Sequence, residues 1–583
     1  MLHIPINEQG WGLMLRLIRS FAASDAGHRA LWLGVLLLVA LLGMNGLNIA
    51  NSYVGRDFFT AIAQRDLRGY VLLGLLYVAV LGASTVVAVL QRFFEERLAL
   101  LWREWMTDRF VTRYMQHPTY FRMSDSVMRT AGMENPDQRI ADDVRAFTST
   151  ALSFAVILLN GMFTVLAFAG VLWAISPGLF GLALAYAAIG SVMTVVLGLS
   201  LVDLNYAQLD KEASFRSGIV HVRENAESLA LLQYQKRLLK RLSRGFGDLV
   251  ANNGEIIRVN RNLGFFTTGY YYMAQVLPVV FVAPLFIAGE VEFGVVTQSV
   301  MAFGTMIGAF SLIITQFQSI SSFAAVIQRL VNLWYAIELA QTDTVSALNL
   351  AEDDDRVAYE SVTLFTPTSS EMLVRNLSVS IPHGTRVLVT SQSDAAREAL
   401  FKATAGLADT GRGRVLRPCH GRIQFLPGSP YLPPGSLRTA LTSDMSAKNH
   451  TDDRLDQVLV ALSLESVVAV SGGLDVERDW NTLLSVRDQQ TFAIARMLLI
   501  APRFAVLDLE SADLAGDMIR RMLALLEQAG VSYIVLARSK FTTAGSLADC
   551  YDAELALLPG GDWIWRELAG HATAPVNPDH LPG

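Results

Sequence analysis

The chain has 583 residues, of which 52% are hydrophobic and 17% are charged. Average globular proteins carry roughly 25% charged residues, so this composition excludes an ordinary soluble protein. The net charge is small, −6 at pH 7, so it implies no nucleic-acid-binding face, and we expect no nucleic-acid partner. The two cysteines, Cys419 and Cys550, form no set of metal ligands, and we expect no metal site.

Residues 1–30 mix charged and apolar side chains, with Arg16 and Arg19 on an expected amphipathic helix. Six long apolar runs follow, and none of them contains a formal charge. Each run has about the length needed to cross ~30 Å of hydrocarbon at about 1.5 Å per residue. The sequence therefore predicts six membrane-spanning helices within residues 31–340, at 31–47, 70–90, 152–175, 179–202, 265–288 and 295–314.

The connections between these runs alternate between short and long. Residues 176–178 join the third and fourth runs, and residues 289–294 join the fifth and sixth. About sixty residues separate the second run from the third, and the fourth from the fifth. Both long connections are expected to be helical and are rich in Lys and Arg. The positive-inside rule places them, and with them both chain termini, in the cytoplasm.

The chain changes character after residue 340. Residues 341–356 are polar and acidic, and we expect them to form a linker. From 357 to 571, β-rich runs alternate with helical stretches, which indicates an α/β domain with a largely parallel sheet. Strands are expected at 357–365, 386–390, 423–426, 504–508 and 532–536, and helices at 395–405, 486–500 and 518–528. The tail at 572–583 contains Pro and His, and we expect it to be disordered.

A series of motifs follows a fixed order in the membrane part. The first long connection contains Trp-Arg-Glu-Trp-Met-Thr at 102–107 and Asn-Pro-Asp-Gln-Arg-Ile at 135–140. The second contains Arg-Glu-Asn-Ala-Glu at 223–227, and Ala-Gly-Glu follows at 288–290. These motifs resemble the SbmA/BacA branch of ABC membrane proteins, relatives of the peroxisomal fatty-acyl ABC transporters. The resemblance covers residues 30–570. It implies an α-helical membrane domain of the type IV, exporter-like ABC fold, followed by an α/β ABC nucleotide-binding-type domain.

The α/β part keeps the frame of an ABC cassette but departs from it at the nucleotide site. By resemblance, Ser391, Asp394 and Ala396 replace the glycines of the phosphate-binding loop. A loop without glycine does not form the tight curl of amides that holds phosphate. Arg397 stands at the position of the phosphate-binding Lys, and Glu398 stands where a Ser or Thr binds Mg²⁺. A carboxylate at ~4 Å from phosphate is repelled by roughly 1–4 kcal/mol per charge pair.

The remaining nucleotide positions also differ from the family pattern. The Walker B carboxylate is kept as Asp508, but Leu509 replaces the catalytic Glu. The Q-loop Gln, the signature Ser, the two signature glycines and the switch His fall, in this order, on Gly428, Ser485, Val486, Arg487 and Arg538. We therefore expect no catalytic residues and no ATPase activity. Binding of ATP and Mg²⁺, the default cofactors of the family, is expected to be weak or absent.

Three functions are compatible with these features. The first is a homodimeric transporter in the bacterial inner membrane that moves peptides or other amphipathic small molecules with the proton gradient. The second is the catalytically inactive half of an ATP-driven heterodimer, and the third is a non-transporting membrane regulator or immunity protein. Because no carboxylate lies inside a run, proton carriers would sit at run ends or on cytoplasmic extensions. A solvated or ion-paired structural role is the alternative for each candidate. The candidates are Asp57, Asp203, Glu212, Glu224, Glu290 and Glu292.

Overall fold

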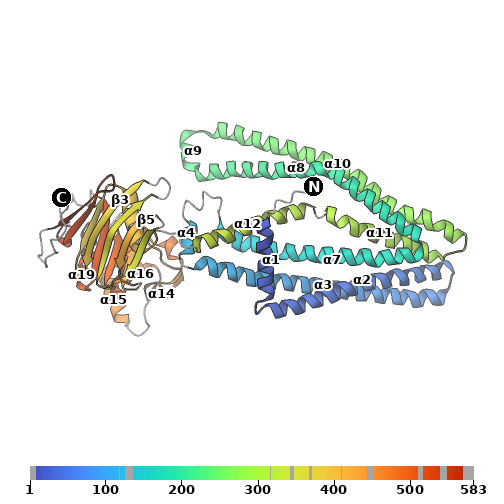
Figure 1. Ribbon diagram of the computed structural model, residues 1–583, viewed down its shortest axis with the longest axis horizontal. Coiled ribbons are helices and arrows are strands. Elements are labelled where there is room, and N and C mark those ends of the chain that lie inside the picture. Colours follow the sequence, from blue (N-terminus) through green and yellow to red (C-terminus); the bar gives the residue numbers. More distant parts are fainter. Residues whose placement is uncertain are drawn as a thin grey trace. The chain divides into compact units, whose positions relative to one another are not determined.

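The computed structural model describes residues 8–568, apart from 117, 125–134, 316, 342–346, 367–370, 409, 420, 443–451, 510–515 and 539–547. The expected tail at 572–583 lies outside the described residues. The chain divides into two compact units, one formed by residues 1–120 and 133–337 and the other by residues 121–132 and 338–583. The first is a helical unit and the second is an α/β unit (Figure 1).

Long helices make up most of the helical unit (Figure 1). The three longest continue beyond their apolar run as polar helix, as expected for the long connections. The elements are α1 (Glu8–Ala22), α2 (Gly27–Ala63), α3 (Leu67–Met115), α4 (Thr119–Ser124), α6 (Pro136–Gln138), the π-helical η1 (Arg139–Asp143), α7 (Val144–Ile175), α8 (Pro177–Glu224), α9 (Ala226–Leu232), α10 (Gln235–Ile287), α11 (Phe293–Thr315) and α12 (Phe317–Gln341).

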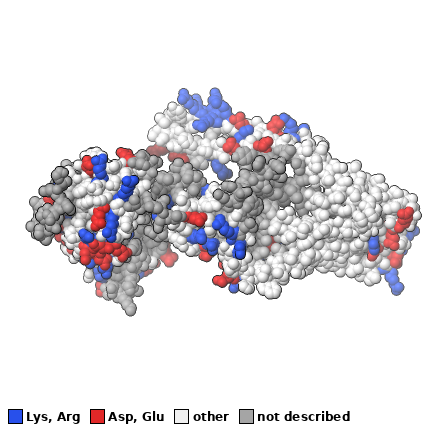
Figure 2. Space-filling model, viewed as in Figure 1, with Lys and Arg blue, Asp and Glu red and all other residues white. Residues whose placement is uncertain are grey.

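Seven described helices are long and apolar enough to cross a membrane, judged by length and composition. Six of them overlap the six predicted runs, and the seventh segment is Ser322–Gln341 in α12. Sequence analysis did not predict a span in α12, because Arg329 and Glu338 interrupt its apolar residues. Figure 2 shows a broad surface of the helical unit without charged side chains. Large apolar side chains lie exposed on this unit, including Leu72 at 69% exposure, as expected for contact with lipid.

A glycine allows α11 to approach α2 closely. A Cβ atom at Gly294 would collide with the carbonyl oxygen of Arg56 and with Thr60 Oγ1. The Gly294 amide instead donates a hydrogen bond of 3.1 Å to Thr60 Oγ1. This bond satisfies one of the amides at the start of α11, which have no partner within the helix.

A pair of tyrosines holds α8 against α10, which run side by side and are joined through α9 (Figure 1). The rings of Tyr186 and Tyr270 stack with 4.2 Å between centroids. Tyr186 OH donates to the Tyr270 carbonyl at 2.7 Å, and Tyr270 OH donates to the Tyr186 carbonyl at 2.9 Å. A Cβ atom at Gly190 would collide with the Tyr270 ring, so only glycine leaves room for this pair.

We expect the substitution Gly190→Ala to displace the Tyr270 ring and to disrupt both hydrogen bonds. Overpacking of this kind lowers the free energy of unfolding by about 1–3 kcal/mol. Thermal unfolding of the purified protein would measure the loss. Gly181→Ala is the matched control, because an added Cβ meets nothing within 4 Å at that position of α8. We call the stacked and hydrogen-bonded pair Tyr186–Tyr270 the tyrosine clamp. Equal melting temperatures for the two variants would contradict its role in holding α8 against α10.

Two larger sheets form the α/β unit. The six-stranded sheet has the order β12-β11-β4-β10-β9-β6, and the four-stranded sheet has the order β1-β5-β2-β3. Strands β4, β6, β9, β10 and β11 pair in parallel, which confirms a largely parallel central sheet. The strands are β1 (Ala347–Glu352), β2 (Arg356–Phe365), β3 (Met372–Pro382), β4 (Val387–Ser391), β5 (Gly411–Arg417), β6 (Ile423–Leu426), β7 (Gly435–Ser436), β8 (Glu477–Arg478), β9 (Phe504–Asp508), β10 (Ser532–Arg538), β11 (Ala553–Leu557) and β12 (Trp563–Glu567).

Helices cover this sheet and complete the two apolar cores of the unit. They are α13 (Asp394–Ala405), α14 (Leu437–Thr442), α15 (Asp452–Ala461), α16 (Glu465–Val470), α17 (Trp480–Leu483), α18 (Val486–Ile500), α19 (Gly516–Gln528) and the 3₁₀ turn η3 (Ala548–Cys550). Strand β1 lies inside the expected linker at 341–356 and pairs with β5 in parallel. The pairing explains this difference, because the strand runs from Ala347 opposite Arg412 to Glu352 opposite Arg417 and so forms through a segment distant in the sequence.

Candidate functional site

The candidate nucleotide site lies where three parallel strands of the central sheet end. Ser391 ends β4 and pairs with Arg538 at the end of β10, and Asp508 ends β9 beside Leu536. Open α/β sheets bind ligands at the carboxyl ends of such strands. The fold therefore brings Ser391, Asp508 and the backbone of Arg538 to one edge of the sheet. The Arg538 side chain lies outside the described atoms.

The loop between β4 and α13 is closed by hydrogen bonds within the chain. Ser391 Oγ donates to the Ser393 carbonyl at 2.9 Å and accepts from the Ser393 amide at 3.0 Å. Ser393 caps α13, and its Oγ accepts from the Ala396 amide at 3.3 Å. In a phosphate-binding loop such amides point at the ligand instead. Here two of them are bonded to serine side chains.

Arg397 turns into the interior beside the Walker B carboxylate. Its side chain is 6% exposed, and its Nε lies 3.5 Å from Asp508 Oδ1. Its Nη1 also lies 3.3 Å from Asp394 Oδ1. The guanidinium thus forms an ion pair with the residue that would coordinate Mg²⁺ in an ATP-binding cassette. The Arg397 guanidinium thus provides the positive charge beside Asp508.

Burial raises the pKa of Asp508, Arg397 opposes this shift, and Glu398 and Asp394 reinforce it. Burial disfavours the ionised carboxylate because it loses hydration, whereas a neighbouring cation favours it. A raised pKa means that the folded protein binds this proton more readily than the unfolded chain. The contribution of Asp508 to stability therefore decreases as the pH rises above the ordinary value of 3.8.

Glu398 forms an ion pair with a lysine of its own helix, and its charge reinforces the raised pKa of Asp508. Its carboxylate is 2.8 Å from Lys402 Nζ, one turn further along α13, and its side chain is 63% exposed. The expectation that Glu398 lies near phosphate oxygens stays a prediction. Ala396, in contrast, is buried in the apolar core beneath the sheet.

The other replaced positions are also engaged in local contacts. The Gln490 side chain is fully buried, and its Nε2 donates to the Gly428 carbonyl at 2.9 Å. Ser485 caps α18, and its hydroxyl donates to Asp488 Oδ2 at 2.6 Å. Leu509 is 2% exposed and belongs to the apolar core, so an uncharged side chain suits its place. Val486 and Arg487 are exposed in the first turn of α18.

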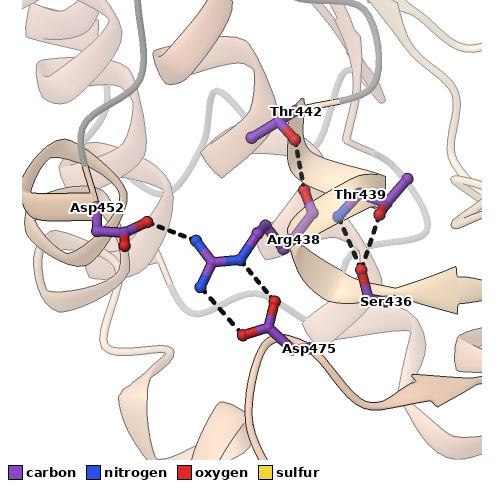
Figure 3. A network of polar contacts seen from close by, with 6 residues as sticks. All are labelled: Ser436, Arg438, Thr439, Thr442, Asp452 and Asp475. Carbon is purple, nitrogen blue, oxygen red and sulfur yellow. Dashed lines mark hydrogen bonds and ion pairs between the residues drawn. The ribbon is translucent and has the colours of Figure 1, made fainter. Parts of the chain in front are cut away.

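A separate, exposed ion-pair network joins Arg438 of α14 to Asp452 of α15 and to Asp475. Figure 3 shows the Arg438 guanidinium between Asp475 and Asp452. Two hydrogen bonds of 2.6 and 3.1 Å join it to the Asp475 carboxylate. The hydrogen bond from Arg438 lowers the pKa of Asp475. Because the folded pKa is lowered, this stabilisation is present at neutral pH and is lost as the pH falls through that pKa.

The candidate proton-carrying acids are mostly exposed on the helical unit. Asp57 is half-buried and lies 2.8 Å from Arg56 Nε in the same helix. Glu212 is exposed and accepts a hydrogen bond from Gln208. The remaining four are exposed on the helical unit, namely Asp203, Glu224, Glu290 and Glu292.

One buried acid was not recognised as a candidate from sequence. Asn135 adopts a left-handed conformation with φ of 55°, and Pro136 begins α6, which leads through η1 to Asp143. Asp143 is 7% exposed, and its two oxygens accept hydrogen bonds of 2.7 and 2.6 Å from Arg329 of α12. The motif at 135–140 was the sequence feature that could have pointed to this acid. It forms the turn and helix start directly before Asp143, whose partner Arg329 is 186 residues away.

We expect Arg397→Met to lower the free energy of unfolding by about 3 kcal/mol at neutral pH, since it leaves the Asp508 carboxylate buried without its cation. The loss should shrink as the pH falls, because protonation of Asp508 removes the unpaired charge. The double variant Arg397→Met/Asp508→Asn should recover most of the lost free energy of unfolding, because it has no buried carboxylate.

Chemical denaturation of the full chain at several pH values would measure these changes. Lys402→Met is the matched control, because its exposed pair with Glu398 is worth at most about 1 kcal/mol. Equal losses in the two single variants, or a pH-independent loss in Arg397→Met, would contradict the assigned ion pair.

Comparisons with known proteins agree with both units. Residues 19–287 match the family described as ABC transporter transmembrane region 2. The chain is 33% identical to ABC transporter D family member 2, chloroplastic, of Arabidopsis thaliana, over 86% of this chain and 80% of the relative. It is 24% identical to the inner membrane ABC transporter ATP-binding protein YddA of Escherichia coli, over 91% and 93%. It is also 24% identical to the lysosomal cobalamin transporter ABCD4 of Mus musculus, over 94% and 95%.

Proposed function

Because the chain belongs to the ABC transporter family, we propose that it is one half of a membrane transporter whose cassette does not hydrolyse ATP. The observation that carries this proposal is the ion pair between Arg397 and Asp508. ATP hydrolysis needs Mg²⁺ on this carboxylate and an amide-lined loop around the phosphates. Here an internal guanidinium lies beside the carboxylate, and serine side chains hold amides of the loop.

Two further features support an inactive cassette. Leu509 occupies the place of the catalytic Glu and is buried among apolar side chains, so it offers no base for the attacking water. Val486 and Arg487 replace the signature glycines, which removes the close backbone approach to nucleotide across a dimer. The cassette then acts as a scaffold that holds two halves together, and we infer a homodimer.

We expect the purified full-length protein in lipid bilayers to release no phosphate from ATP above the level of its Asp508→Asn variant. The physical reason is that Mg²⁺ would have to displace a buried guanidinium from Asp508. A phosphate-release assay, with calorimetric titration of Mg²⁺-ATP, would measure both steps. Turnover that Asp508→Asn abolishes would refute the proposal. Turnover that appears only after mixing with a second, intact half-transporter would favour the heterodimer instead.

For the arrangement in the membrane, we propose six spans with α12 on the cytoplasmic side and both termini in the cytoplasm. Even paired charges cost free energy inside the hydrocarbon. The ion pair between Arg329 and Asp143 therefore supports a place for α12 outside it. The links 176–178 and 289–294 contain no Lys or Arg, as expected for outer loops. The inner membrane relative of Escherichia coli supports the bacterial inner membrane as the location.

The cargo class we propose is peptides or other amphipathic small molecules, in line with the SbmA/BacA resemblance. The mouse relative is named for cobalamin, which is a further candidate. Without ATP hydrolysis, the proton gradient is the energy source we favour. The six candidate acids would then act from the ends and extensions of the helices. Five of them are exposed in the single chain, where water can reach them for proton exchange.

We expect proteoliposomes that contain the full chain to take up a labelled peptide only under an imposed proton gradient. Neutralising Glu290 and Glu292 together, as Glu290→Gln/Glu292→Gln, should slow uptake if these acids carry protons. Asp508→Asn should leave uptake unchanged, because the cassette carboxylate plays no part in the coupling. Uptake that is indifferent to the gradient would eliminate proton coupling.

A further inference from the structure

A cavity of about 500 Å³, open to the surface and lined by both polar and apolar atoms, lies between α3 and α7 of the helical unit. Six of its lining residues lie on one stripe of α3, and two serines of α7 complete it. The lining residues are Ala88, Gln91, Arg92, Glu95, Glu96, Ala99, Ser149 and Ser153. This volume is within the range of about 300–1,000 Å³ of pockets that bind small organic molecules.

The cavity lies at the point where the apolar runs of both helices end. The apolar run of α3 ends at residue 90, directly before Gln91, and the run of α7 begins at residue 152, between Ser149 and Ser153. Two independent hydropathy boundaries therefore meet at the cavity. On the six-span arrangement proposed above, on which this inference rests, the cavity lies at the cytoplasmic boundary of the hydrocarbon.

The charges around the cavity leave one carboxylate without a cation. Arg92 and Glu96 form an ion pair of 3.0 Å, with side chains 81% and 68% exposed. Glu95 is half-buried, and its Oε1 accepts a hydrogen bond of 2.9 Å from Ser153 Oγ. Among the described residues, no cationic side chain lies within ion-pair distance of Glu95. Two glutamates and one arginine give the lining a formal charge of −2 + 1 = −1.

Apolar side chains continue from the cavity along α3 into the membrane part. Leu81 is 43% exposed and Val78 is 66% exposed, and both lie on the same stripe of α3 as Ala88, at the spacing of residues that share a helix face. A ligand with a charged head in the cavity could therefore lay an alkyl chain along this face. The described residues contain no group of three His, Cys, Asp or Glu side chains that could hold a metal ion. A single carboxylate in a cavity of this size suits an organic cation better.

We propose that this cavity binds the ammonium head of an amphiphile, with Glu95 as its counter-ion and Ser153 orienting the carboxylate. The alkyl part lies along the exposed apolar face of α3. Two sources share this chemistry, a bilayer lipid with an ammonium head and a cationic amphipathic cargo that enters from the cytoplasmic leaflet. Arg92 neutralises Glu96 and so confines the negative charge to Glu95.

Photolabelling of the full-length protein tests this site. The protein is placed in bilayer discs of phosphatidylglycerol, which has no ammonium group, and exposed to a long-chain alkylammonium that carries a diazirine. A matched probe with a hydroxyl head has the same chain. Mass spectrometry quantifies the labelled peptides of α3 and α7. We expect the ammonium probe to label these peptides on the order of fivefold more than the hydroxyl probe, the effect of one partly exposed ion pair.

Glu95→Gln should reduce ammonium labelling to the level of the hydroxyl probe. The matched control is Glu104→Gln, an exposed carboxylate on the same helix outside the cavity, which should change nothing. Equal labelling of the native protein and Glu95→Gln would overturn the proposal. So would equal labelling by the two probes on the native protein, a comparison that needs no variant.

Added phosphatidylethanolamine distinguishes the two sources. Competition by this lipid would identify the cavity as a lipid site, whereas labelling that persists would identify it as a site for cargo; both outcomes support an ammonium site. The assay measures binding without ATP or a proton gradient. A cassette that proves to hydrolyse ATP would therefore refute the proposed mechanism and leave the result at Glu95 unaffected.

Discussion

The absence of water from the hydrocarbon layer is the constraint on which the helical unit depends. Each backbone amide and carbonyl must find its partner inside the chain, and continuous helices satisfy this requirement. Buried polar side chains follow the same rule. Asn45 of α2 donates to the Leu41 carbonyl and to Asn160 Oδ1 of α7, and it accepts from Thr164. Polar groups therefore join these helices where apolar packing alone would leave their rotation undefined.

Much of the fold could be predicted from the sequence because its signals are local. Strands β6 and β9 coincide with the predicted ranges 423–426 and 504–508, where short apolar runs end at clear turns. Hydropathy detects only the apolar part of a long helix, so it could not show that α10 begins at Gln235. Strand β5, with the sequence Gly-Arg-Gly-Arg-Val-Leu-Arg, lacks a local β signal and forms through its pairing with β1 and β2.

The candidate site could be predicted as a set of replacements but not as an arrangement. The sequence shows that Arg397 stands where Lys is expected, yet not that its guanidinium turns inward to Asp508. It also gave no reason to pair Asp143 with Arg329, since that contact arises from the packing of α12 against the start of α7. Both are tertiary relations between distant residues. Neither local propensity nor hydrophobic periodicity contains this information.

The tyrosine clamp between α8 and α10 has a mechanical consequence. Helix α8 continues for 34 residues from Gly190 to Glu224, a rigid arm of about 51 Å at about 1.5 Å per residue. With the arm held to α10 near its membrane end, a tilt of about 5° at the clamp carries α9 through about 4 Å. The two helices thus form a lever, in which a small rotation among membrane side chains becomes a displacement comparable to a helical turn at the far end.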